Sequence, residues 1–194
     1  VTPTVDVVDN KVNITEIALA KENSPSETAM VASDAQMALG SMWRSEGNNL
    51  MKRMGELRYA NDDGGAWTRV SRSKHTRGGD YGFTNHMTSI QIGYDQRQAA
   101  ENGVWRRGIA LSRDEGKSSY NKGKGENTNT SLALYGTWLG DKGHYLDLVL
   151  KGSRLRNEHE TYGKYADSGT GKNWAASILS LIHISEPTRR SYIS

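Results

Sequence analysis

Alternation of apolar and polar residues with a period of two runs through most of the chain after residue 65. This period places successive side chains on opposite faces of a β-strand. In 86–97, for example, Ile90 and Ile92 share one face, whereas Gln91 and Asp95 share the other. The pattern predicts strands at residues 66–72, 86–97, 103–113, 129–139 and 143–156.

A segment with helical spacing precedes these strands. Apolar residues recur along it at roughly helical spacing, at Met37, Met42, Leu50, Met54 and Leu57. We therefore predict a helix over 34–59, with Asp34 as its N-cap. Residues 1–33 carry two short alternating runs and then a polar stretch, which indicate the end of an upstream domain followed by a linker.

Each predicted strand has one apolar face and one polar or small face, a pattern that fits two kinds of protein. A soluble β-sandwich turns the apolar face inward, whereas a membrane barrel turns it outward to lipid. The connections favour the barrel, because long polar loops at 73–85 and 114–128 alternate with short ones at 98–102 and 140–143. The alternative is a soluble β-sandwich binding module with a helical linker.

Composition excludes several classes of protein. The chain has no cysteine, so a disulfide framework, a thiolate zinc site and a cysteine nucleophile are excluded. A mean hydropathy of -0.72, without a long apolar run, excludes a helical membrane span. The net charge of +3 is too small to indicate a nucleic-acid partner, and the histidines lack metal-binding spacing. We expect no metal, no cofactor and no activity on external substrates.

Several phrases between Ala35 and Leu155 resemble the translocator domain of autotransporters, the type V secretion proteins. The matching phrases are Met-Trp-Arg-Ser-Glu at 42–46, 48–58, 65–69, Gln-Ile-Gly-Tyr-Asp at 91–95, 134–139 and 143–147. The resemblance implies an outer-membrane barrel of twelve antiparallel strands that exports its own N-terminal passenger to the cell surface. It also implies the barrel assembly machinery and periplasmic chaperones as partners.

The resulting fold class is all-β: an incomplete antiparallel outer-membrane β-barrel, preceded by a long α-helix that plugs the lumen. About five of the twelve expected strands can be counted, so the chain would hold the first portion of the barrel. Residues 179–194 look like the translation of a sequencing adapter rather than a sixth strand. The predicted regions are the passenger end and linker at 1–33, the lumenal helix at 34–59, the barrel at 60–178 and a non-native tail at 179–194.

The asparagine pair in the predicted helix is the main candidate for chemistry. An asparagine amide can attack its own main-chain carbonyl and cut the chain when an acid assists proton transfer. The resemblance to self-cleaving autotransporters names Asn48 as the cyclising residue, Asn49 as the residue after the cut and Asp147 as the lumenal acid. The plainer interpretation is that both amides are solvated or hydrogen-bonded side chains.

The basic residues of the helix are the second candidate group. Lumenal acids such as Asp95 and Asp147 are their expected partners, which would hold the helix in register within the barrel. Simple solvation in a water-filled pore is the alternative. The basic residues concerned are Arg44, Lys52, Arg53 and Arg58.

Overall fold

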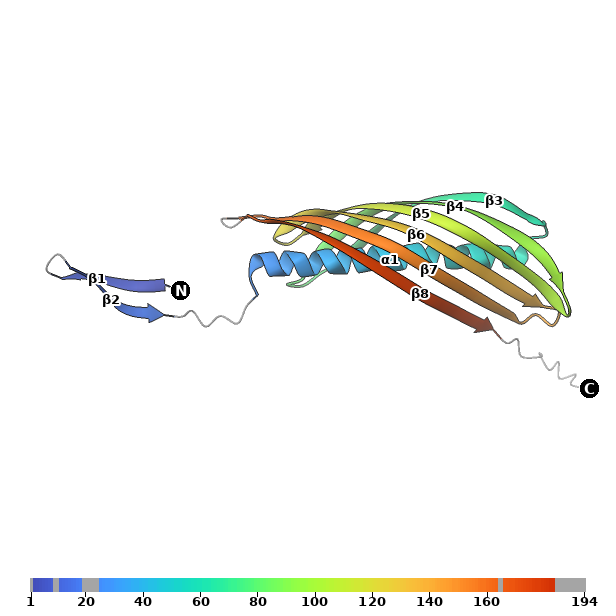
Figure 1. Cartoon of the computed structure of the whole chain (residues 1–194), viewed down its shortest axis with the longest axis horizontal. Helices are drawn as coiled ribbons and strands as arrows, with labels where there is room; N and C mark the ends of the chain where they lie inside the picture. The colour runs from blue at the N-terminus through green and yellow to red at the C-terminus, as the bar shows by residue number, and fades with distance from the viewer. Residues whose placement is uncertain (1, 9–10, 19–24, 164–165, 184–194) are drawn as a thin grey trace, which may run out of the picture.

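The computed structural model describes residues 2–8, 11–18, 25–163 and 166–183, which form two antiparallel sheets and one helix (Figure 1). The strands β1 (Thr2–Val8) and β2 (Lys11–Ala18) pair with each other. The larger sheet has six strands in chain order. They are β3 (Gly64–Arg77), β4 (Phe83–Ala100), β5 (Gly103–Tyr120), β6 (Gly123–Gly140), β7 (Tyr145–Thr161) and β8 (Ser168–His183).

The helix α1 (Glu27–Tyr59) begins earlier than predicted. Its N-cap is Ser26, whose hydroxyl accepts a hydrogen bond of 3.2 Å from the Ala29 amide. The prediction of Asp34 as the N-cap is therefore wrong, and Asp34 lies buried within the helix. The extra turns form because they contain good helix formers and because Val31 packs against the sheet.

The core lies between α1 and the concave inner face of the large sheet, along which the helix runs (Figure 1). One stripe of the helix supplies most of its apolar contacts. Leu50, Met54 and Leu57 pack against small residues of β5 and β6, whereas Leu39 and Met42 pack against β4 and β7. The predicted fold class, an antiparallel β-sheet preceded by a long helix, is confirmed.

The strands are longer than predicted and the loops correspondingly shorter. The expected loop 114–128 shrinks to 121–122, and the expected loop 73–85 shrinks to 78–82. Beyond the apolar part of each strand both faces are polar, as at buried Asp114 and exposed Glu115, so hydropathy no longer alternates. The predicted contrast between long and short loops is therefore wrong, and loop length does not distinguish a barrel from a sandwich in this chain.

A sixth strand of the large sheet, β8, was missing from the sequence-based prediction. It pairs with β7 along its whole length, from Ser168 opposite Glu160 to His183 opposite Tyr145. Residues 179–183 are thus strand, contrary to the expectation for the tail, because they pair with the available edge of β7. Residues 184–194 lie outside the described residues, and the non-native origin of 179–194 stays a prediction.

The large sheet is open in the described part of the chain. Each of the outer strands, β3 and β8, is paired on one side, and β4 to β7 are each paired on both. Among the described residues, no helix has the length and apolar character needed to cross a membrane.

Candidate functional site

The inner face of the large sheet, which lies against α1, is polar, and the outer face is apolar. On β4, Gln91 is fully buried beneath the helix, whereas Ile92 keeps 53% of its surface exposed. The same alternation holds on β5 and β7, where Ser112 and Asp147 are buried and Leu148 is exposed. This facing contradicts the soluble β-sandwich, whose apolar side chains would form the core. It matches a barrel with a polar lumen and an apolar exterior.

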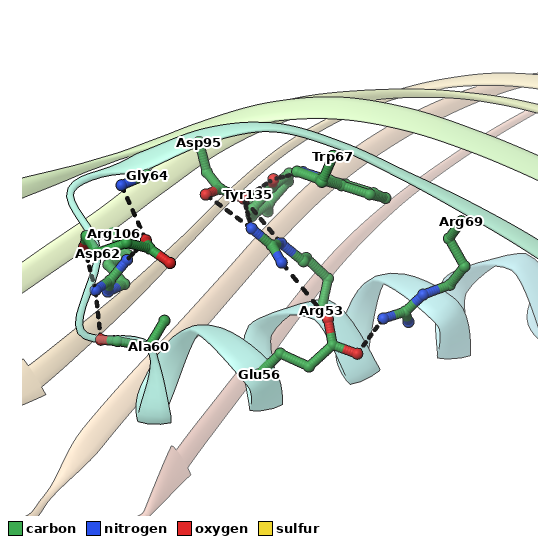
Figure 2. A network of polar contacts seen from close by, with 10 residues as sticks. All are labelled: Arg53, Glu56, Ala60, Asp62, Gly64, Trp67, Arg69, Asp95, Arg106 and Tyr135. Atoms are coloured by element: carbon green, nitrogen blue, oxygen red, sulfur yellow. Dashed lines mark hydrogen bonds and ion pairs between the residues drawn. The ribbon is translucent and has the colours of Figure 1, made fainter.

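A cluster around Asp95 ties the second half of the helix to the sheet (Figure 2). Arg53 donates two hydrogen bonds to the Asp95 carboxylate, of 2.9 and 3.0 Å. Tyr135 donates a third to that carboxylate at 2.8 Å and accepts one of 2.8 Å from the Trp67 indole. A bidentate guanidinium–carboxylate pair is directional as well as charged, so it fixes the rotation of the helix at this point.

Two glycines of the inner face make room for the rings of this cluster. A Cβ atom on Gly108 would lie 2.6 Å from the ring of Tyr135, and one on Gly93 would lie 2.5 Å from the ring of Trp67. Both distances are shorter than any tolerated contact between carbon atoms. Glycine at these positions therefore lets the aromatic rings lie flat on the sheet and reach Asp95.

A second ion pair joins the end of the helix to β7. Arg58 donates a hydrogen bond to the Asp147 carboxylate, which also accepts one of 2.8 Å from the Thr137 hydroxyl. The Arg58 guanidinium lies 3.7 Å from the centre of the Tyr145 ring, a favourable cation–π position. Asp147 is thus fully engaged by neighbours at the C-terminal end of α1.

A third pair, Glu46 with Lys151, is the most deeply buried, with exposed side-chain fractions of 1% and 4%. The Lys151 ammonium lies 2.5 Å from the Glu46 carboxylate and donates a hydrogen bond of 2.9 Å to the Trp43 carbonyl. Glu46 also accepts hydrogen bonds from Gln91 at 3.1 Å and from Ser112 at 3.0 Å. Such additional bonds offset the cost of removing both charges from water.

The C-terminus of α1 is closed by an arginine from β5 (Figure 2). Buried Arg106 donates hydrogen bonds to the Ala60 carbonyl at 2.5 Å and to the Asp62 carbonyl at 2.7 Å. These bonds satisfy main-chain oxygens just beyond the helix end, where no further turn follows. The hydrogen bond from Arg106 to the Asp62 carboxylate, assisted by the Gly64 amide, lowers the pKa of that carboxyl.

A family model of the autotransporter β-domain matches residues 66–181, which include all of the polar inner face from β4 to β7. The chain belongs to the autotransporter β-domain family. It is accordingly part of an outer-membrane β-barrel. The predictions of family and location are confirmed.

The relatives of this autotransporter β-domain are much longer proteins. The pertactin autotransporter of Bordetella bronchiseptica is 29% identical over 167 residues, covering 80% of this chain and 18% of pertactin. The serine protease SepA autotransporter of Shigella flexneri is 31% identical over 126 residues, covering 65% of this chain and 9% of that protein. The chain therefore spans less than a fifth of the length of these curated relatives.

One solved structure matches in fold. The β-domain of the Bordetella autotransporter BrkA superposes with a TM-score of 0.51 at 24% sequence identity. The match covers 61% of this chain and 48% of the BrkA chain. The similarity of fold agrees with a partial barrel and its helix.

The two asparagines of the predicted cleavage site point in different directions, about 100° apart around the axis of α1. Asn48 is exposed on the helix face that points away from the sheet, together with Arg44 and Lys52. Asn49 is 6% exposed and faces β3. Its side-chain amide donates a hydrogen bond of 3.0 Å to the Ser71 hydroxyl.

The main chain at Asn49 is held as well. Its carbonyl accepts a hydrogen bond of 2.8 Å from Arg69 of β3, and Arg69 also contacts Glu56 (Figure 2). The residue that would follow the cut is thus fixed to the barrel through both its side chain and its carbonyl. Neither Arg69 nor Ser71 was singled out from the sequence.

The structure does not bring the predicted acid to the predicted cleavage site. Asp147 pairs with Arg58, which follows Asn48 by ten residues, or about 15 Å along the helix axis. The expected approach of Asp147 to Asn48 is therefore absent from this arrangement. The reason is the register of the helix, which places Asn49 beside β3 and Asp147 near the helix end.

Of the four helix cations, the structure pairs Arg53 with Asp95 and Arg58 with Asp147. Arg44 and Lys52 form no ion pair with any residue in the described ranges, since they lie on the uncovered face. Two further partners of the helix, Lys151 and Arg106, were not predicted from the sequence, although both are inward-facing cations on predicted strands. Their position on the polar face of those strands was the signal that could have identified them.

Proposed function

We propose that this chain forms the first part of a translocator barrel through which its own N-terminal passenger reaches the cell surface, with α1 held in the lumen. The observation that carries the proposal is the reversed polarity of the sheet. Many charged and amide side chains are buried against the helix, and most of the large aliphatic side chains of the sheet face outward. The rest of the barrel would cover the helix face that carries Arg44, Asn48 and Lys52.

This function explains why so many charges lie between the helix and the sheet. Three ion pairs connect α1 to β4 and β7, and each includes further hydrogen bonds to neighbouring side chains or carbonyls. A soluble domain would gain more from an apolar interface, because burying charges costs free energy. A pore that must pass a polypeptide benefits from a hydrated, polar wall. Assembly would require periplasmic chaperones and the barrel assembly machinery.

The test uses the full-length gene with the passenger replaced by an epitope-tagged reporter. We expect a heat-modifiable outer-membrane protein and a reporter that antibody and external protease reach on intact cells. The control is the same reporter, with the same export signal, lacking everything from Glu27 onward. A barrel fraction that remains soluble without detergent, or a reporter exposed equally without the barrel, would contradict the proposal.

A single cut after Asn48 is a second candidate function, favoured by the fixation of Asn49 on β3. The side-chain amide nitrogen of Asn48 would attack the main-chain carbonyl carbon of the same residue, forming a cyclic imide. The bond to the Asn49 nitrogen would break as the proton lost by the attacking side-chain amide passes to that nitrogen, which leaves as a free amine. Because Asn49 is held to β3, the peptide bond between Asn48 and Asn49 keeps one orientation.

Mass spectrometry of the full-length barrel fraction tests this cut. We expect a fragment that begins at Asn49 in the natural sequence and an uncut protein in Asn48→Asp. Asn61→Asp is the matched control, since Asn61 lies just beyond the helix, and it should be cut normally. An uncut natural protein that is still folded and exported would exclude the cleavage and leave the translocator function intact.

A further inference from the structure

The outer face of the large sheet carries an apolar groove across β5 to β8. Side by side across these strands lie Leu111, Leu132, Gly152 and Ala176. Because Gly152 and Ala176 have little or no side chain, they form the floor, with Leu132 and Trp174 lining the sides. A Cβ atom on Gly152 would meet no atom within 4 Å, so the space above it is open.

A row of cations borders this groove at one end. The next outward-facing positions on the same strands are Arg113, Thr130, Arg154 and Trp174. Arg113 donates a hydrogen bond of 2.8 Å to the Thr130 hydroxyl between the two arginines. The Arg154 guanidinium lies 5.8 Å from the centre of the Trp174 ring, and Trp174 is 80% exposed.

The next row along the same direction is still cationic, but it carries less net positive charge. The following row contains Arg156 and Lys172, opposed by the single carboxylate of Glu115 on the described strands β5 to β8. Arg113 and Arg156 have carboxylate neighbours, but Arg154 and Lys172 form no ion pair within the described part of the chain. An unpaired guanidinium thus lies directly at the mouth of an apolar groove, facing lipid.

The proposed function, on which this inference rests, fixes the depth of the groove and of its cations in the membrane. The cationic end of the groove lies toward Tyr120 and Gly123, which lie beside Val31 near the helix N-terminus. A passenger that precedes the helix leaves from that end. The cations therefore lie at the level of the outer-leaflet headgroups, and the groove lies at the level of the acyl chains.

We propose that this groove binds a phosphorylated glycolipid of the outer leaflet, with a phosphate between Arg113 and Arg154 and an acyl chain over Gly152 and Ala176. A guanidinium matches phosphate oxygens by paired, charge-assisted hydrogen bonds. Trp174 supports the Arg154 guanidinium from one side and borders the acyl chain on the other. The chemistry required of the ligand is one phosphate adjacent to several saturated chains.

The experiment titrates the full-length barrel in detergent with diphosphorylated lipid A and counts bound lipid by native mass spectrometry. We expect Arg154→Gln to weaken binding about tenfold, since it removes charge-assisted hydrogen bonds to phosphate. Lys124→Gln is the charge-matched control. Lys124 lies at the same end of the barrel but pairs with Glu160 at 3.1 Å, so this variant should bind normally.

Gly152→Leu tests the groove separately, because it keeps every charge and fills the floor. We expect it to weaken binding as much as Arg154→Gln does. Equal losses in Arg154→Gln and Lys124→Gln would overturn the proposal, as would equal binding of dephosphorylated lipid A or normal binding by Gly152→Leu. Heat-modifiability and reporter export are measured on the same variants. A folded, exporting barrel without lipid binding refutes this inference alone, whereas a natural chain that forms no membrane barrel refutes the proposed function.

Discussion

At the residue scale, α1 is held by charged side chains that are removed from water and paired. Glu46, Arg53 and Arg58 each meet a partner of opposite charge on the inner face of the sheet. Such pairs add little to the free energy of unfolding when compared with a well-packed apolar contact. Removal of one partner is strongly destabilising, because it leaves an uncompensated buried charge. The interface therefore tolerates only a narrow range of helix positions.

Lys151→Met should destabilise the helix–barrel interface by roughly 3–5 kcal/mol, because it leaves the Glu46 carboxylate buried without a cation. Urea unfolding of the full-length barrel, followed by loss of heat-modifiability, measures this change. The double variant Glu46→Gln with Lys151→Met should recover part of the loss, since no charge remains buried. Equal stability of the single and double variants would contradict the argument.

The matched control for this variant is Lys124→Met. It removes a lysine from an ion pair in which both side chains are more than half exposed. Surface pairs contribute only about 0–1 kcal/mol, so this change should have little effect on unfolding. A loss as large as that of Lys151→Met would show that total charge, rather than the buried pair, sets the stability.

Arg69 has a predicted effect on cleavage rather than on assembly. If the cut after Asn48 occurs, Arg69→Gln should slow it about tenfold or more, because a charge-assisted hydrogen bond to the Asn49 carbonyl is lost. Pulse-chase labelling of the full-length protein measures the rate of the cut. Arg72→Gln, an exposed outward-facing arginine on the same strand, is the control. Equal rates in the natural protein and Arg69→Gln would exclude this role.

At the element scale, each long strand consists of an apolar segment and a polar extension. Along β5, for example, the outward-facing side chains change from Ile109 and Leu111 to Arg113 and Glu115. Most inward-facing positions of β5 remain polar or small, and Tyr120 at its end packs against Val31 of the helix. The apolar segments of neighbouring strands lie side by side and form one lipid-facing band.

Leu132→Arg should destabilise the full-length barrel by about 2–4 kcal/mol, since it places a charge on the lipid-facing band. Thr128→Arg, four residues away on the same face of β6 but beyond the band, should cost about 1 kcal/mol or less. Folding into lipid vesicles at increasing urea concentration measures both. Equal costs would mean that the outer face does not contact hydrocarbon.

At the scale of the whole molecule, the open sheet is the dominant feature. The strands β3 and β8 each present one unpaired edge in the described part of the chain (Figure 1). In hydrocarbon, every unpaired main-chain group costs several kcal/mol, because no water is present to bind it. Closure by further strands removes both edges.

Residues 25–183 expressed alone with an export signal should therefore fail to form a heat-modifiable membrane protein, whereas the full-length barrel should form one. Electrophoresis of unheated and heated outer-membrane fractions distinguishes the two. The full-length gene expressed from the same promoter and signal is the control. A heat-modifiable species from residues 25–183 would show that the open sheet closes on itself or on a second copy.

The sequence alone was sufficient to predict the helix and which side chains share a face of each strand. The antiparallel order came from the resemblance to autotransporters, and periodicity by itself left open whether the apolar face points inward or outward. Strand ends were not predictable in the same way, because both faces carry polar side chains there, as at Asp114 and Glu115. The strand β8 was missed because its final residues were assigned to a non-native tail. Asp34 was a plausible cap, but Ser26 became the N-cap because packing of Val31 favours extra helical turns. Local signals thus failed where a tertiary contact outweighed them.

What the sequence determined by itself was which side chains share a face, because a strand has a fixed period of two. What tertiary structure decided was which of those side chains meet the helix. The register of α1 pairs Arg53 with Asp95 and Arg58 with Asp147, places Asn49 against β3, and leaves Asn48 far from Asp147. Such pairings depend on the position of a helix along a curved sheet, and no spacing within one segment encodes that position.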